Sequence, residues 1–227
     1  MAQRQYIVNK VNCNLDNLDN DTFWNGIAVL KITDYLWIPN NYKPDVFIQV
    51  LYSDDYFYLK FNVMEEKISI RYTNINDPVY KDSCVEFFIN LFPEITEEYF
   101  NFEFNALGVL KLGYGIRRNR FYLNEFDINE IKVVSSIKNT LVGFHGSDRW
   151  ILYSAIPIRL LEKITNRKFA ANDAIGNFYK CGDETEFKHY GMWNFIDNLT
   201  PDFHLPEYFG KIVFQKWFLF FNTTLVR

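Results

Sequence analysis

The sequence of 227 residues predicts an all-β fold. Aromatic residues make up 19% of the chain, with 23 Phe and 15 Tyr, and such residues favour pleated, half-buried surfaces. Several stretches also alternate apolar and polar residues with the period of two that a strand imposes, most strictly YFNFEFNALG at 99–108. These observations predict an antiparallel β-sandwich of immunoglobulin or jelly-roll type, with one short helix near 157–165.

The strands follow one another without a low-complexity linker, so we expect a lead-in over 1–20 and a single domain over 21–227. After an apolar segment at 24–36, VFIQVLY and YFYLKFNVM form a predicted hairpin around Ser53-Asp54-Asp55. Pro157 is placed to begin the short helix, because proline is tolerated in a first turn. The further predicted strands lie at 83–92, 99–108, 109–115, 130–139, 150–158, 174–183 and 209–217.

The C-terminal tail, WFLFFNTTLVR at 217–227, begins with five apolar residues. Such a tail is not expected to be exposed to water. It is interpreted as a final strand or a packed cover, and the alternative is a contact in a homodimer.

Composition excludes two classes of partner. The net charge is −4, the isoelectric point is about 5.5 and no stretch is a basic run, so no nucleic-acid partner is expected. No apolar stretch approaches a membrane span, and the N-terminus lacks the apolar core of a signal peptide. The chain as given is therefore either cytoplasmic or a trimmed form of a secreted protein.

The three cysteines, Cys13, Cys84 and Cys181, are widely spaced, and none forms a CxxC pair. An odd number without a framework predicts neither a disulfide scaffold nor a zinc site. Cys84 lies in an apolar run and is interpreted as a small buried hydrophobe. No metal and no cofactor are therefore expected.

Two features suggest a binding surface. The phenylalanines of YFNFEFNALG belong in a core, which leaves Asn101, Glu103 and Asn105 on the opposite face, near Glu86 of the preceding predicted strand. Amides and carboxylates suit sugar hydroxyls, and the alternative is an ordinary solvated outer face. The segment 188–210 looks like a loop yet is rich in aromatic residues, whose rings can stack on sugar rings or pin the loop to the sandwich.

The order and spacing of several motifs resemble the family 9 carbohydrate-binding modules, most of all the standalone bacterial proteins called carbohydrate-binding family 9-like. The motifs are DPVYKDSCVEFFINL, YFNFEFNALG, GNFYKCGDE, HYGMW and PDFHLPEYFGKIVF, and the resemblance runs from about Asp21 to Phe214. It implies an antiparallel β-sandwich without catalytic activity. It also implies that the end of a mono- or oligosaccharide is held between two aromatic side chains.

The resemblance carries over residue by residue. It implies that Tyr80 and Phe203 are the two aromatic platforms, where the best-known members have tryptophan, and the smaller rings would stack less strongly by about 1 kcal/mol each. It also implies that polar side chains contact sugar hydroxyls and that one aromatic residue lies beside the site. The acidic calcium-binding loops of some relatives are not recognisable in this sequence. The implied carbohydrate-binding residues are Tyr80, Glu86, Asn101, Glu103, His189, Trp193 and Phe203.

Three alternatives stay open at this point. Glu86 and Glu103 could be the carboxylate pair of a glycoside hydrolase if they lie about 5 to 9 Å apart. A sandwich protein with an interaction role and no sugar binding is the second alternative. The third is a haem module, for which the available ligands would be Met64, Met192, His189 and His204.

Overall fold

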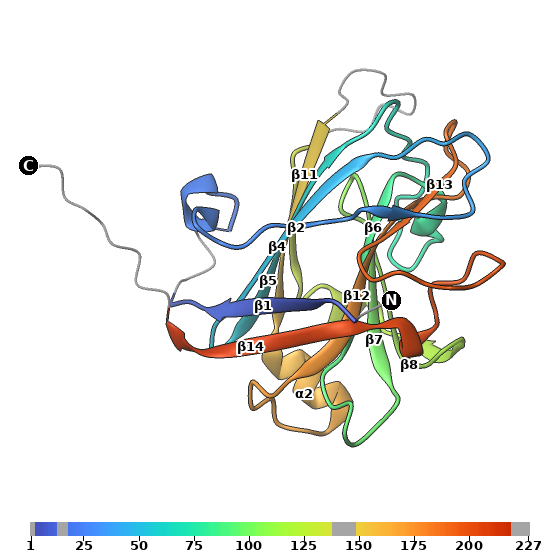
Figure 1. The fold of residues 1–227 in the computed structure, drawn as a ribbon. Helices are drawn as coiled ribbons and strands as arrows, with labels where there is room; N and C mark the ends of the chain where they lie inside the picture. Colours follow the sequence, from blue (N-terminus) through green and yellow to red (C-terminus); the bar gives the residue numbers. More distant parts are fainter. Residues whose placement is uncertain (1–2, 13–17, 138–148, 219–227) are drawn as a thin grey trace, which may run out of the picture.

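The computed structural model describes residues 3–12, 18–137 and 149–218, which form a curled, mixed sheet of 14 strands. Figure 1 shows the curled arrangement of the strands, with a short helix at one end. The strands are β1 (Gln5–Lys10), β2 (Leu30–Lys31), β3 (Asp34–Tyr35), β4 (Asp45–Tyr52), β5 (Tyr56–Met64), β6 (Cys84–Asn90), β7 (Tyr99–Asn105), β8 (Leu110–Ile116), β9 (Asn119–Tyr122), β10 (Lys132–Ser135), β11 (Arg149–Pro157), β12 (Ala174–Gly182), β13 (His189–Met192) and β14 (Gly210–Phe218). The helices are α1 (Glu125–Ile128) and α2 (Ile158–Thr165), with 3-10 turns η2 (Asp21–Trp24), η3 (Val79–Lys81) and η4 (Pro206–Tyr208).

The N-terminal strand β1 joins the two halves of the sheet. The strand order is β10-β11-β5-β4-β1-β14-β12-β6-β7-β8-β9, and Figure 1 shows β1 and β14 side by side. β1 pairs in parallel with β14, where Gln5 lies opposite Lys211, and with β4, where Asn9 lies opposite Leu51. The sheet is therefore mixed rather than purely antiparallel, and the expected lead-in over 1–20 contains a strand. Parallel partners are distant in the chain, so no local pattern reveals such a pairing.

The predicted hairpin and the predicted helix are both present. β4 and β5 pair antiparallel around the turn, where the Ser53 hydroxyl accepts hydrogen bonds from the backbone N–H groups of Asp55 and Tyr56. Helix α2 follows Pro157 directly and buries its apolar side against the core. These elements depend on local signals, a turn-forming Ser-Asp-Asp and a proline at a helix start, which is why the sequence predicts them.

Besides β1, the two-residue strands β2 and β3 and the 3-10 turns, three four-residue elements are not predicted by the sequence. The structure adds the one-turn helix α1, the edge strand β9 and the strand β13, which lies inside the segment 188–210 interpreted as a loop. Each has only four residues, too few for a periodic pattern to stand out. β13 forms because its backbone pairs with β12, where Tyr190 lies opposite Cys181.

The core fills the space between the two halves of the curled sheet. Phe100, Phe102 and Phe104 stack along β7 with ring centroids 5.9 and 6.5 Å apart, and all three are buried. Phe104 reaches across to Phe61 of β5, at 6.5 Å. The period-two prediction for these phenylalanines is confirmed, since they face the core of the other half-sheet.

The opposite face of β7 is buried as well. Asn101, Glu103 and Asn105 are at most 3% exposed. Aromatic side chains from the connections cover this face, among them Trp37 and Phe203, which pack on residues of β6, β7 and β12. The interpretation of this row as an ordinary solvated face is therefore wrong.

A buried ion pair connects β12 to the other half of the sheet. The Lys180 side chain is fully buried, and its Nζ lies 3.0 Å from Glu65 Oε2 and 2.8 Å from His189 Nε2. Trp150 Nε1 donates to the second Glu65 oxygen at 2.6 Å. Because Lys180 points inward, the strand alternation turns Cys181 outward, toward the covered polar face.

Most of the aromatic tail lies outside the described residues, since these end at residue 218. A homodimer contact through 217–227 therefore stays a prediction. Among the described residues, no helix combines the length and the apolar character that crossing a membrane requires.

We expect Lys180→Met to lower the free energy of unfolding by about 3 to 5 kcal/mol, because it leaves the Glu65 carboxylate buried without its charge partner. Urea denaturation would measure the change, and a further Glu65→Gln substitution should restore part of it.

Lys31→Met is the matched control, because Lys31 pairs with Asp45 at 2.6 Å while both side chains are about half exposed. Its effect should stay below about 1 kcal/mol. Equal losses in the two lysine variants would contradict the role of the buried pair.

Candidate functional site

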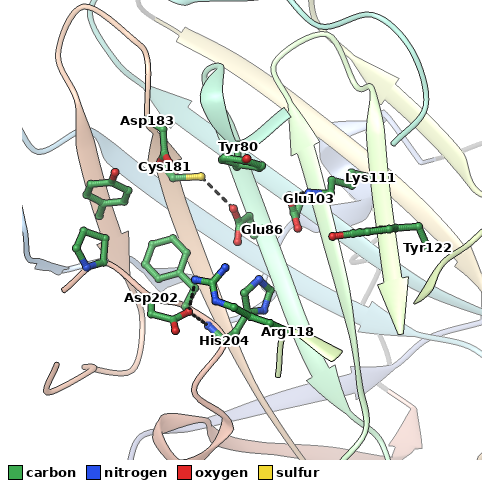
Figure 2. Close-up of a pocket in the computed structure, with 13 residues that line it drawn as sticks. Tyr80, Glu86, Glu103, Lys111, Arg118, Tyr122, Cys181, Asp183, Asp202 and His204 are labelled. Atoms are coloured by element: carbon green, nitrogen blue, oxygen red, sulfur yellow. Dashed lines mark hydrogen bonds and ion pairs between the residues drawn. The ribbon is translucent and has the colours of Figure 1, made fainter. Parts of the chain in front are cut away.

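A pocket of about 280 Å³ opens on the covered polar face, above β6, β7 and β8 (Figure 2). Its floor is the sheet, and its walls come from η3, β9, the end of β12, β13 and the segment before η4. The lining residues are Tyr80, Glu86, Glu103, Lys111, Arg118, Tyr122, Cys181, Asp183, Tyr190, Pro201, Asp202, Phe203 and His204.

A row of charged side chains crosses the floor of the pocket. In the antiparallel register, Glu86 of β6 lies directly opposite Glu103 of β7, which lies opposite Lys111 of β8. Directly opposed residues have Cβ atoms about 4.5–5.5 Å apart, so the two carboxyl groups are close neighbours. Figure 2 shows them on adjacent strands, between Cys181 on one side and Lys111 on the other.

The two carboxyl groups have different partners. Cys181 Sγ donates to Glu86 Oε1 at 3.0 Å, and Asn101 Nδ2 donates to Glu103 Oε1 at 2.7 Å. Glu103 Oε2 is buried without a hydrogen-bond partner among the described residues, since Lys111 Nζ approaches it only to 3.6 Å as an ion pair. A buried acceptor with spare capacity is costly unless a ligand completes it.

Burial controls the ionisation of both groups. It raises the pKa of Glu86 well above its usual range, and the neighbouring Glu103 raises it further, while the Cys181 thiol opposes the shift. Burial also raises the pKa of Glu103, opposed by the nearby Lys111 ammonium and by the hydrogen bond from Asn101. Perturbed carboxyl groups at the floor of a cleft mark a candidate functional site.

Cationic and aromatic groups form the walls. Lys111 Nζ lies over the rings of Tyr80 and Tyr122, 4.7 and 5.0 Å from their centroids. Arg118 pairs with Asp202 at 2.9 Å. The walls therefore offer donors and ring faces in the same space as the acidic floor.

Phe203 and His204 are positioned from below. The Phe203 ring stacks on Tyr179 at 4.1 Å and 9°, so Tyr179 covers one of its faces. The His204 ring stacks on the Phe88 ring, with centroids 5.0 Å apart. His204 Nδ1 and the Tyr99 hydroxyl share a hydrogen bond of 3.1 Å. Burial, followed by the charge of Arg120, lowers the pKa of His204 to about 2, so the imidazole is neutral.

The structure brings four of the seven sequence-predicted residues into the pocket and one just beneath it. Tyr80, Glu86, Glu103 and Phe203 line it. Asn101 lies underneath, where it bonds to Glu103.

His189 and Trp193 lie elsewhere. On β13 the strand alternation aims Tyr190 at the pocket, so His189 points away, toward Lys180. Trp193 packs in the core against Phe178, with ring centroids 5.8 Å apart. Aromatic and imidazole side chains near a binding segment satisfy packing as readily as binding, which a motif match does not distinguish.

Several lining residues were not predicted. A lysine inside the apolar run VLKLGYG was the available signal for Lys111, because its strand follows the one that carries Glu103. No signal marked Tyr122, since β9 itself was not predicted. Arg118, Asp202 and His204 reach the pocket through tertiary contacts.

Comparison with known proteins places the chain in a family. The model of carbohydrate-binding family 9 matches residues 16–214. The chain belongs to carbohydrate-binding family 9. The resemblance inferred from the motifs is thus confirmed. Among curated proteins, none matches this family 9 chain.

Solved structures share the fold of this family 9 chain. A crystal structure of a candidate carbohydrate-binding protein from Bacteroides uniformis is 27% identical, with a TM-score of 0.85, and covers 94% of this chain and 100% of its own. A family 9 module from Caldicellulosiruptor kristjanssonii is similar both in complex with cellotriose (13% identity, TM-score 0.60) and with glucose (12%, 0.62). These two cover 93% of this chain and 94% and 96% of their own.

We expect Glu86→Gln to stabilise the protein increasingly as the pH rises. Because its pKa is raised, Glu86 keeps its proton in the folded protein above pH ~4.3, where the unfolded chain loses it. The free energy of unfolding of the wild type therefore falls by up to about 1.4 kcal/mol for each pH unit between ~4.3 and the raised pKa. Urea unfolding between about pH 4 and pH 8 would measure the difference.

Glu207→Gln is the control, because Glu207 is exposed and pairs with exposed Arg117. The Glu207→Gln substitution should change the free energy of unfolding by less than about 1 kcal/mol over the whole pH range. A Glu86→Gln difference that does not change with pH would contradict the assigned burial cost.

Proposed function

We propose that this protein binds the end of a mono- or oligosaccharide in the pocket and has no catalytic activity. The observation that carries the proposal is that platform and polar residues implied by the family, Tyr80, Phe203, Glu86 and Glu103, line one pocket. Membership of carbohydrate-binding family 9 supports it. The relatives from Caldicellulosiruptor kristjanssonii, in complex with cellotriose and with glucose, suggest glucose-based ligands.

The chemistry of the pocket suits sugar hydroxyls, which both donate and accept. The carboxyl groups of Glu86 and Glu103 provide acceptors at the floor, and the spare Glu103 Oε2 awaits a donor. Lys111, at the end of the charged row on the floor, and Arg118, at the wall, provide donors. A few polar groups among apolar walls fix the orientation of a small ligand.

The size of the pocket favours the end of a glycan. Its volume of about 280 Å³ lies at the lower limit of small-molecule sites, which is about 300 Å³. One or two sugar rings would fill it, and the rest of a chain would extend into solvent.

The aromatic contacts differ from the tryptophan pair of the best-known members. Tyr80 and Phe203 are smaller, and Tyr122 provides a third ring from β9, half exposed at 49%. We propose that Tyr122 supplies stacking area that the two smaller rings lack.

We also propose that the fold is a β-sandwich in a single domain. A β-sandwich in a single domain over 21–227 is supported by the two half-sheets that pack across one core. β1 extends this domain toward the N-terminus.

Glycoside hydrolysis is the second candidate, favoured by the neighbouring carboxyl groups with raised pKa values. Hydrolysis requires two carboxyl groups that flank the scissile bond. Glu86 and Glu103 are side by side on one face of a sheet, so both lie on the same side of any ligand above them. This arrangement supports binding over hydrolysis.

The interaction role without sugar binding and the haem module have weaker support. A protein with only an interaction role has no need to bring Tyr80 and Phe203 to one cavity, but both line the pocket. As for haem, His189 Nε2 already bonds to Lys180, and Met192 Sδ accepts from the Ile196 N–H at 3.2 Å.

We expect calorimetric titration with glucose, cellobiose and cellotriose to show binding that Tyr80→Ala, Phe203→Ala and Tyr122→Ala each weaken by about tenfold. The reason is the loss of stacking, worth up to about 1.5 kcal/mol per ring.

Phe121→Ala is the matched control, because Phe121 lies beside Tyr122 on β9 with a similar exposure of 55% but contacts Tyr114 on the other face. The affinity of the Phe121→Ala variant for these sugars should equal that of the wild type. If no member of a wider sugar panel binds at millimolar concentration, the proposed function is wrong.

We also expect no release of chromophore from aryl glycosides by the wild type, because the carboxyl groups do not flank a ligand. Turnover that disappears in Glu103→Gln would favour the hydrolase instead.

A further inference from the structure

Two cysteines 97 positions apart in the sequence meet beneath the pocket. In the antiparallel register of β6 and β12, Cys84 lies directly opposite Cys181, and both are free thiols with at most 1% exposure. Because side chains two apart share a face, Glu86 lies on the same side as Cys84. Nothing in the spacing of the cysteines indicates this meeting.

The three side chains form a compact set of potential ligands. One ligand atom each from Cys84, Glu86 and Cys181 lies within 4.8 Å of the others, and Cys181 Sγ is 3.0 Å from Glu86 Oε1. Two thiolates on one tetrahedral zinc ion lie about 3.8 Å apart, given Zn–S bonds of about 2.3 Å. Side-chain rotations that move these atoms by roughly 1 Å would therefore let all three bind one ion.

We propose that Cys84, Glu86 and Cys181 bind one thiophilic divalent cation, of the zinc type, at the floor of the pocket. Thiolate ligands select zinc and similar soft ions over calcium or magnesium. Three protein ligands leave a fourth position, and Glu86 and Cys181 border the pocket, so this position faces the cavity.

An independent observation also points to a ligand at this floor. Glu103 Oε2, buried and beside Glu86, has no hydrogen-bond partner among the described residues. A water molecule in the open position of the metal would be a donor for such an oxygen.

Metal binding at this site is coupled to proton release, so the affinity rises with pH. Burial raises the pKa of the Cys84 thiol to about 12 and that of Cys181 well above its usual range, so without metal both keep their protons. Binding releases the two thiol protons and the Glu86 proton to solvent. The charge of +2 on the ion compensates two of the three anionic ligands, and the nearby Lys111 ammonium supplies further positive charge at this floor. One Glu86 oxygen binds the ion, and the other is left for a pocket ligand.

The test is a titration of the full chain, metal-free and reduced, with Cd²⁺ as a spectroscopic probe. Cys13→Ser serves as the parent, because it removes the third thiol from the sequence. We expect one Cd²⁺ per chain, ultraviolet sulfur-to-cadmium charge-transfer absorbance, displacement by Zn²⁺ and a raised unfolding midpoint.

Variants identify the ligands. Cys84→Ser and Cys181→Ser should each weaken Cd²⁺ binding by at least about 100-fold, and Glu86→Gln by about tenfold. Glu207→Gln, an exposed carboxylate on the surface, should leave it unchanged. If a cysteine variant fails to fold, cadmium NMR of the parent counts the thiolate ligands without any substitution.

Two results would overturn the metal site. They are no charge-transfer absorbance at excess Cd²⁺ with the reduced protein, or absorbance that persists in both cysteine variants. Because no sugar is present in the titration, such a failure leaves the proposed carbohydrate binding untouched.

Discussion

The register between β6 and β7 sets two carboxyl groups, Glu86 and Glu103, directly opposite each other on a buried face, and the whole site depends on this pairing. Two neighbouring carboxylates out of water are unfavourable, so each needs compensation. The Cys181 thiol, the Asn101 amide and the Lys111 ammonium supply part of it. Glu103 Oε2 is left without a hydrogen-bond partner among the described residues, and both proposals for this floor depend on that oxygen.

The cover over this face makes the pocket. Aromatic side chains such as Trp37, Tyr190 and Phe203 pack on the outer face of the sheet, so polar side chains that would otherwise be solvated are desolvated. Desolvation strengthens their interactions with any ligand that enters. On the inner face of the same sheet, Lys180 bonds to Glu65 in the core and anchors β12. Both faces of the half-sheet are therefore buried, one for stability and one around a cavity.

Family 9 membership and the geometry both support the proposed ligand, a small hydroxylated molecule. The pocket of this chain has an acidic floor with a thiol beside it, and the rings on its walls are smaller than tryptophan. Glu86 is central to the proposed sugar site and to the proposed metal site, since it borders Glu103 on one side and Cys181 on the other.

The sequence by itself determined the all-β class, the hairpin at Ser53, the start of α2 and the faces of β6 and β7, because these follow from local turn chemistry and a period of two. Its motifs also identified the family and four pocket residues. Only the tertiary structure decided the parallel pairing of β1, the burial of the polar face, the orientation of His189 away from the pocket toward Lys180 and the meeting of Cys84 with Cys181. These depend on which distant strands pair and which connections cover them, and the free energy of such contacts has no signature in a short stretch of chain.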